Sequence, residues 1–265
     1  VLLAVTVLAL LLAEHLPWLF APGFATDPGK FALTGDLLRI TFPYLLFIAM
    51  TAFAGGVLNS YGRFAIPAFT PVLLNLVLIA ATIFAVDWFE EPLFALAWGV
   101  FFAGLLQLLF QLPFLARLQL LVRPTVKRDD EGVKRIVGLM VPALFGVSVS
   151  QINLLLDTVL ASFLENGSVS WLYYADRLNN LPLGIFAIAI GVVILPALSS
   201  KHAAEQADGF ARTLDWALRM VLLLALPAAV ALALLAQPLM ATIFYHGEMT
   251  AYDIVQMSTA LQAYA

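Results

Sequence analysis

The sequence feature that most constrains the fold is a series of long apolar runs separated by short charged loops. A helix needs about 20 apolar residues to cross the hydrocarbon core of a bilayer, and six runs are that long. They are Leu37–Asn59, Phe64–Val86, Leu93–Leu115, Ile136–Leu164, Trp171–Leu198 and Leu214–Phe244. Barrel strands need only about 9 to 11 residues, so runs of this length predict helices. We therefore expect an all-α fold, a polytopic transmembrane helical bundle.

Composition agrees with a lipid environment and argues against several kinds of chemistry. Hydrophobic residues make up 63% of the chain and charged residues 11%, whereas soluble domains carry roughly 25% charged residues. The absence of cysteine excludes disulfides, thiol catalysis and Cys-ligated zinc, and the three histidines follow no metal-ligand spacing. No nucleophile elbow, P-loop or zinc-protease motif occurs. We expect neither an enzyme nor a nucleic-acid-binding protein, and no organic cofactor.

Both ends of the sequence lie within helix-like patterns. The chain begins inside the apolar run Val1–Leu12, with no preceding basic segment of the kind a signal peptide has. At the other end, Ala251–Ala265 has a helical pattern shorter than a membrane span. Counting these two partial segments gives eight. We therefore expect further helices of the same protein beyond each end.

Basic residues alternate from loop to loop, which predicts the orientation, because short cytoplasmic loops are enriched in lysine and arginine. One set of loops holds Arg63, Arg117, Arg123, Lys127, Arg128, Lys134, Arg135, Lys201 and Arg212. The other set holds few basic residues and most acids: Glu14, Asp27, Asp36, Asp87, Glu90, Glu91, Glu165, Glu248 and Asp253. We place the first set in the cytoplasm. The start of the Trp171 helix then lies in the outer half of the membrane.

The loop at residues 117–135 is the longest charged stretch and contains Pro124. It predicts a boundary between a first helical lobe at residues 1–116 and a second lobe at 136–265. A solvated cytoplasmic loop that only anchors the topology explains the same charges. The two interpretations are compatible.

Arg177 is the strongest candidate for a functional residue. A guanidinium at the middle of a membrane helix costs about 2.5 to 3.5 kcal/mol, so it needs a polar environment. Tyr173, Arg177, Asn180 and Gly184 share one helix face, and Asp176 is adjacent. We take Tyr173, Asp176, Arg177 and Asn180 as a candidate substrate-binding set. Alternatively, Arg177 extends to the outer interface or is neutralised by Asp176.

A second polar stripe, on the preceding helix, contains Gly146, Ser150, Asn153 and Asp157. A buried carboxylate must take up a proton or find a cation. Oxygen ligands from Asp157 and Asn153 suit Na⁺, and the carboxylate alone suits H⁺. We therefore consider a coupling-ion site here, with a structural ion pair between Asp157 and Arg177 as the alternative.

Prolines mark the segment Phe64–Val86, in which Pro67, Pro71 and Asn75 recur on one side with Thr70 adjacent. These residues predict either the lining of a pathway or a bent packing face with an amide hydrogen bond between helices. The pair Gly55–Gly56 predicts close helix packing.

Several motifs along the whole chain resemble the MurJ/MviN lipid II flippases. They are Gly56–Asn75 (GVLNSYGRFAIPAFTPVLLN), Gln107–Pro113 (QLLFQLP), Gly146–Asn153 (GVSVSQIN), Ser168–Arg177 (SVSWLYYADR), Thr213–Trp216 (TLDW) and Phe244–Ala251 (FYHGEMTA). This family belongs to the multidrug/oligosaccharidyl-lipid/polysaccharide exporter superfamily. The resemblance implies parts of two pseudo-symmetric lobes around a central cavity, covering about the third to the tenth of fourteen helices.

The resemblance also implies a function. Family members move an undecaprenyl-diphosphate-linked peptidoglycan precursor from the inner to the outer leaflet of the bacterial plasma membrane. Arg177 matches a cavity arginine thought to engage the diphosphate, whereas the other cavity arginines lie on the family's first two helices. Partners would be this anionic lipid and membrane lipids, with membrane potential and Na⁺ or H⁺ as driving forces. An ion-coupled multidrug or lipid-linked oligosaccharide exporter of the same superfamily is the alternative.

Overall fold

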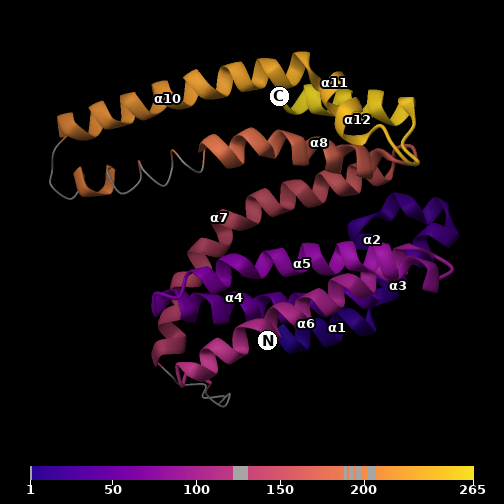
Figure 1. Cartoon of the computed structure of the whole chain (residues 1–265), viewed down its shortest axis with the longest axis horizontal. Coiled ribbons are helices and arrows are strands. Elements are labelled where there is room, and N and C mark those ends of the chain that lie inside the picture. Colours follow the sequence, from indigo (N-terminus) through magenta and orange to yellow (C-terminus); the bar gives the residue numbers. More distant parts are fainter. Residues whose placement is uncertain (1, 122–130, 188–189, 191–193, 195–197, 202–206) are drawn as a thin grey trace. The chain divides into compact units, whose positions relative to one another are not determined.

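The computed structural model describes residues 2–121, 131–187, 190, 194, 198–201 and 207–265 (Figure 1). Every element in that part of the chain is a helix, of the α, 3-10 or π type. The all-α prediction is therefore confirmed. Arg123, Pro124, Lys127 and Arg128 of the basic loop, together with Pro196 and His202, lie outside the described residues.

Five helical stretches in the described part are long and apolar enough to cross a membrane. They are Pro28–Ser60, Ala65–Phe84, Leu93–Arg117, Arg135–Ser162 and Asp208–Leu234. Leu2–Leu11 and Ala13–Phe20 form a further candidate if taken as one span, bent by 72° at the break between them. A polytopic membrane protein follows, as the sequence predicts.

Contacts divide the chain into two compact units, Val1–Phe163 and Leu164–Ala265. The first unit contains α1 (Leu2–Leu11), α2 (Pro17–Phe20), α3 (Pro28–Thr41), α4 (Tyr44–Ser60), α5 (Ala65–Phe84), α6 (Leu93–Arg117) and α7 (Glu131–Ser162), with the 3-10 turns η1 (Ala13–His15), η2 (Pro22–Thr26) and η3 (Val86–Trp88). The predicted lobe boundary at 117–135 concerns the whole protein and stays a prediction.

The core of the first unit is the packing of α6 against α4 and α5, which run alongside it (Figure 1). Small residues on α6 allow this close approach, as is usual between membrane helices. A Cβ added at Gly99 would come within 3.1 Å of the Ala81 side chain, and one at Gly104 within 2.5 Å of the Tyr44 ring. These glycines therefore determine how closely α6 approaches its neighbours.

Buried amides join α6 to α5 inside this unit. The Gln107 amide donates to the Thr70 carbonyl at 3.1 Å, and the Gln111 amide donates to the Thr70 hydroxyl at 2.9 Å. Asn75 is exposed, so the amides that link the helices come from α6. The close packing predicted for Gly55–Gly56 is confirmed at Gly55, where an added Cβ would lie 3.2 Å from Pro67, and is wrong at Gly56, where an added Cβ would meet nothing within 4 Å.

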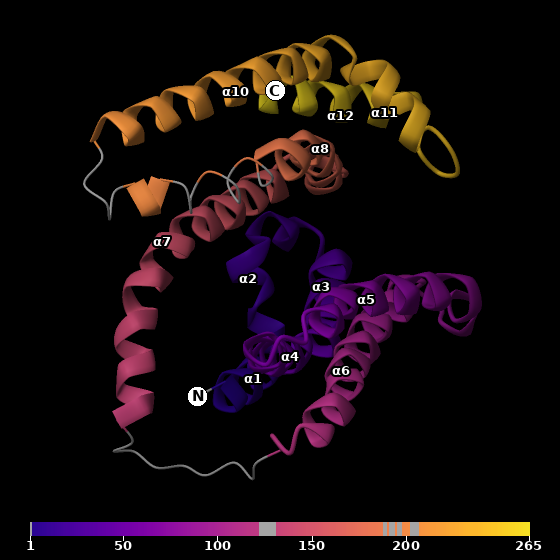
Figure 2. The same ribbon diagram turned by 60° about the vertical axis from the view of Figure 1, so that its left-hand side comes forward.

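Figure 2 shows α7 bending along its length, and Pro142 lies inside it. A proline in a helix interior removes one backbone hydrogen bond and bends the helix. Near its end, α7 meets η2, where the Gly23 N–H donates to the Ser162 hydroxyl at 3.0 Å. A Cβ at Gly23 would overlap the Ser162 backbone, so only glycine fits this contact.

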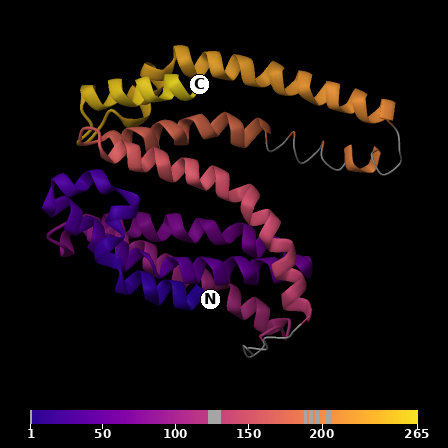
Figure 3. The ribbon, with the colours of Figure 1, turned by 180° about the vertical axis from the view of Figure 1, so that it is seen from behind.

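The second unit contains α8 (Ser168–Pro182), the π-helix η4 (Leu183–Ala187), α10 (Ala207–Leu234), α11 (Ala236–Phe244) and α12 (Ala251–Tyr264). Figure 3 shows α10 as a long continuous helix. The core of the second unit is formed by buried side chains from α8, α10, α11 and α12. They are Trp171, Ala175, Leu232, Ala236, Met240, Ile254, Met257 and Leu261.

Two predicted bounds in this unit are wrong. The run Leu214–Phe244 forms two helices, because α10 begins at Ala207 and ends at Leu234, and α11 follows. Pro238 has no N–H to donate to the carbonyl of Leu234, which favours a break there. The Trp171 helix begins at Ser168 and changes to a π turn after Pro182; residues 188–189, 191–193 and 195–197 of that run lie outside the described part.

Candidate functional site

The helix that carries Arg177 begins at a sharp turn that requires glycine. Gly167 precedes α8 with φ +109°, a left-handed backbone conformation that side chains disfavour. A Cβ at Gly167 would also approach the Trp171 ring to 2.6 Å. The Ser168 hydroxyl donates to the Glu165 carbonyl at 2.8 Å. This turn sets where α8 starts.

α8 has a buried apolar face and an exposed polar face. Trp171 and Ala175 are buried in the core of the second unit, whereas Tyr173, Arg177 and Asn180 are exposed. The two sets differ by about half a turn, since residues three and four apart share a face. The exposure of Arg177 is thus a direct consequence of packing Trp171 into the core.

Four predicted site residues form two pairs along this exposed face. The Arg177 guanidinium lies over the Tyr173 ring, 4.9 Å from its centroid, a cation–π contact. The Asn180 amide donates to the Asp176 carboxylate at 2.8 Å. No ion pair between Arg177 and Asp176 occurs among the described residues. A cation–π contact uses none of the N–H donors of the guanidinium, so these remain free to bind an anion.

Gly184 falls in the π turn that follows α8, and an added Cβ there would meet nothing within 4 Å. π turns within helices often occur at functional sites. Gly184 is thus exposed, like Tyr173 and Arg177 on the preceding turns of α8.

Contacts between α8 and α12 hold the head of α8 in place. The Trp171 indole N–H donates to Asp253 at 2.8 Å, and the Tyr252 hydroxyl donates to Glu165 at 2.9 Å. Asp253 also forms a reciprocal capping box with Thr250. These residues were missed by the sequence analysis as a group, although the Thr250-x-x-Asp253 spacing is a recognisable capping signal.

The electrostatics of this contact follow from its hydrogen bonds. Asp253 lies outside the span candidates named above. Donors from Thr250, first its hydroxyl and then its backbone N–H, and from the Trp171 indole lower the pKa of Asp253. The hydrogen bond to Glu165 raises the pKa of Tyr252. The ionised form of Asp253 therefore stabilises the start of α12.

The predicted ion site lies on α7. Asn153 and Asp157 are both exposed, and neither side chain makes a hydrogen bond or ion pair with another described residue of the first unit. A Cβ at Gly146, on the same stripe, would meet nothing within 4 Å. Within the described part of the chain, no three His, Asp or Glu side chains are placed to hold a metal ion. The ion site stays a prediction.

The fold and the site together define a class, a multi-pass helical membrane protein with exposed polar side chains on α7, which is a span candidate, and on α8. Such intramembrane polar residues usually mark substrate or ion pathways. The profile of the family described as "Lipid II flippase MurJ" matches residues 1–265, the whole chain. The chain therefore belongs to the lipid II flippase MurJ family.

Individual relatives agree with this assignment. The chain is 49% identical to the probable lipid II flippase MurJ of Haemophilus influenzae, covering 98% of this chain and 54% of that protein. It is 50% identical to the probable lipid II flippase MurJ of Vibrio cholerae, covering 98% and 51%. The chain thus spans about half the length of these curated relatives.

A solved structure, "Lipid II flippase MurJ, inward closed conformation", is also similar. The TM-score is 0.81 at 27% sequence identity, covering 99% of this chain and 54% of that one. The resemblance derived from the sequence motifs is confirmed by both kinds of comparison.

Proposed function

We propose that this chain is part of a lipid II flippase of the bacterial plasma membrane, a transporter with no catalytic reaction of its own. Its cargo would be an undecaprenyl-diphosphate-linked peptidoglycan precursor, moved from the inner to the outer leaflet. The observation that carries the proposal is the match of the whole chain to the flippase family. Helices of the same protein beyond those seen here would complete the transport path.

In this proposal, Arg177 binds the diphosphate of the cargo. Its guanidinium is exposed, and its contact with Tyr173 orients it without using its N–H groups. A guanidinium binds phosphate oxygens through two parallel hydrogen bonds, which Lys cannot reproduce. Asn180 and Asp176 are linked by a hydrogen bond to each other, and they offer polar groups to the sugar that is attached to the diphosphate.

Transport would proceed by alternating access, with the polyprenyl tail remaining in lipid. Membrane potential supplies about 2.3 kcal/mol per charge moved across 100 mV. Asp157, with Asn153, would bind the coupling Na⁺ or H⁺. The exposed position of both side chains on α7 leaves them accessible to ligands from other helices.

Binding of undecaprenyl diphosphate to the whole polypeptide that carries this sequence tests the role of Arg177. Because a hydrogen bond to a charged group contributes about 1.5 to 3 kcal/mol, Arg177→Ala should weaken binding by roughly tenfold or more. Arg177→Lys should restore only part of the affinity. Arg135→Ala, at an exposed site on α7, is the control. Equal affinity of the wild type and Arg177→Ala would contradict the role.

A further inference from the structure

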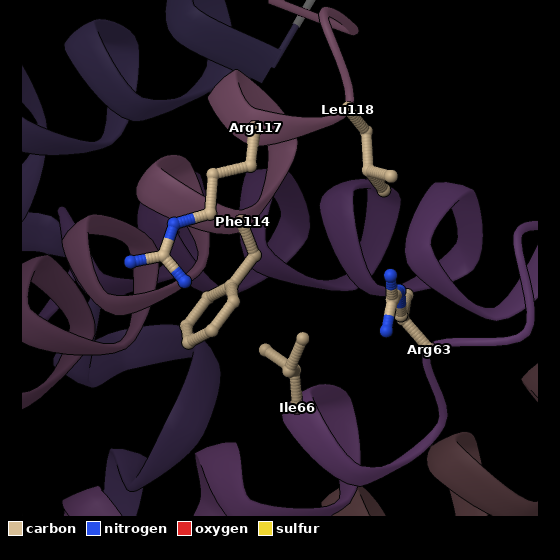
Figure 4. Close-up of a pocket in the computed structure, with 5 residues that line it drawn as sticks. All are labelled: Arg63, Ile66, Phe114, Arg117 and Leu118. Atoms are coloured by element: carbon tan, nitrogen blue, oxygen red, sulfur yellow. The ribbon is translucent and has the colours of Figure 1, made fainter.

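A small cavity lies where α4 ends, α5 begins and α6 ends, within the first unit. Its volume is about 200 Å³, and it is lined by Arg63, Ile66, Phe114, Arg117 and Leu118. Figure 4 shows the two arginines on opposite sides, with the Phe114 ring and Ile66 between them. A water molecule occupies about 30 Å³ in the liquid, so this space can hold a phosphate group. None of these residues belongs to the site on α8.

A turn of the same form lies next to each arginine. After α4, Gly62 adopts φ +72° and the Arg63 N–H donates to the Leu58 carbonyl at 2.9 Å. After α6, Gln119 adopts φ +57° and the Leu120 N–H donates to the Leu115 carbonyl at 3.0 Å. Both turns have the form of a Schellman helix cap. Each turn reverses the backbone direction at the end of its helix, next to the cavity.

The base of this cavity is firmly packed. Leu58 and Leu115 are buried together with Ala54 in one cluster, and Ile66, Phe114 and Leu118 pack against it. Side chains that line the cavity therefore extend from a fixed apolar layer. Because this layer is already fixed, only the two exposed arginine side chains have to be ordered when a ligand binds.

The two guanidiniums bring positive charge to the cavity. Both arginines are exposed, and within the described residues neither forms an ion pair or a side-chain hydrogen bond. Arg117 lies over the Phe114 ring, 5.8 Å from its centroid. α5 also starts here with no side-chain cap, so its first N–H groups add positive partial charge.

The cavity lies at the ends of three span candidates, Pro28–Ser60, Ala65–Phe84 and Leu93–Arg117. Arg63 and Arg117 belong to the basic loops that the charge pattern assigns to the cytoplasm. The cytoplasmic surface of a membrane is rich in lipid phosphates, which attract clustered basic residues. The other residues that line the cavity, Ile66, Phe114 and Leu118, are apolar, as a position beside acyl chains requires.

We propose that Arg63 and Arg117 form a binding site for a phosphate group at the cytoplasmic membrane surface, separate from the cargo site at Arg177. Each guanidinium donates a fork of hydrogen bonds to phosphate oxygens, and Ile66, Phe114 and Leu118 form the apolar side of the site. A phospholipid headgroup and free phosphate share this chemistry. The inference rests on the geometry of the first unit and does not depend on the proposed function.

The test measures phosphatidylglycerol bound to the whole polypeptide in detergent micelles, by native mass spectrometry, with a parallel titration of inorganic phosphate. The double variant Arg63→Gln/Arg117→Gln should bind phosphate groups roughly tenfold or more weakly than the wild type. Weaker binding of phosphatidylglycerol identifies a lipid headgroup as the source. Weaker binding of inorganic phosphate alone identifies free phosphate.

A matched control removes the same charge elsewhere. Arg135→Gln/Arg212→Gln takes two exposed arginines from the same predicted side of the membrane, outside the cavity, and should leave binding within about twofold of the wild type. Arg63→Lys/Arg117→Lys keeps the charge and should retain part of the affinity, which separates binding from folding. The proposal is overturned if neither ligand loses affinity in the glutamine variant, or if the control loses as much.

Discussion

At the scale of single residues, Arg177 and Tyr173 contact each other on the exposed face of α8. The expected grouping of Tyr173 and Arg177 on one face is seen, and their spacing of four residues brings the guanidinium over the ring. The sequence analysis considered Asp176 as a partner of Arg177. Instead, the amide of Asn180, one turn away, donates a hydrogen bond to Asp176. The bond from Trp171 to Asp253 joins residues 82 apart in the chain, and no local pattern predicts such a distance.

The capping role of Asp253 predicts a dependence of stability on pH. Its pKa is lower in the folded protein than the ordinary value of 3.8, so the stabilisation is present above that value and is lost as pH falls through the folded pKa. The thermal unfolding temperature of the wild type should therefore fall on acidification more than that of Asp253→Asn. Glu248→Gln, at an exposed residue of the same loop, is the control. Parallel curves for wild type and Asp253→Asn would contradict the prediction.

At the scale of elements, apolar length predicted the spans because a membrane helix must be long enough to cross the hydrocarbon core. Helix ends were predicted less well, because proline effects and caps act within a single turn. The run from Leu214 to Phe244 shows this, since it reads as one apolar segment but divides at Leu235. Packing between helices was predicted at Gly55 but not at Gly104, whose partner Tyr44 is remote in sequence.

Glycine substitutions on two helices test the packing of α6. Gly104→Ala should destabilise the protein by about 1 to 3 kcal/mol, because its Cβ would meet the Tyr44 ring. Gly56→Ala should be neutral or stabilising by up to about 1 kcal/mol, since its Cβ meets nothing within 4 Å and alanine favours a helix. Thermal unfolding in detergent measures both. Equal effects of the two substitutions would contradict the packing described here.

At the scale of the whole molecule, the charge pattern predicts an orientation that the helices alone leave open. The chain contains no cysteine, so single cysteines can report on it. Ser60→Cys precedes the turn at Arg63 and should be cytoplasmic, whereas Glu90→Cys should lie outside; both residues are exposed. A membrane-impermeant maleimide should label only Glu90→Cys in intact cells. Labelling of Ser60→Cys instead would reverse the orientation.

The chain spans about half the length of its curated relatives, so transport is proposed for the whole polypeptide that carries this sequence. The central claim is that Arg177 binds the diphosphate of the cargo during transport. The most direct measurement is the exposure of the lipid-linked precursor at the outer leaflet in cells that depend on the whole polypeptide. With Arg177→Ala at normal protein levels, exposure should fall roughly tenfold or more. Exposure equal to that of the wild type would contradict the account.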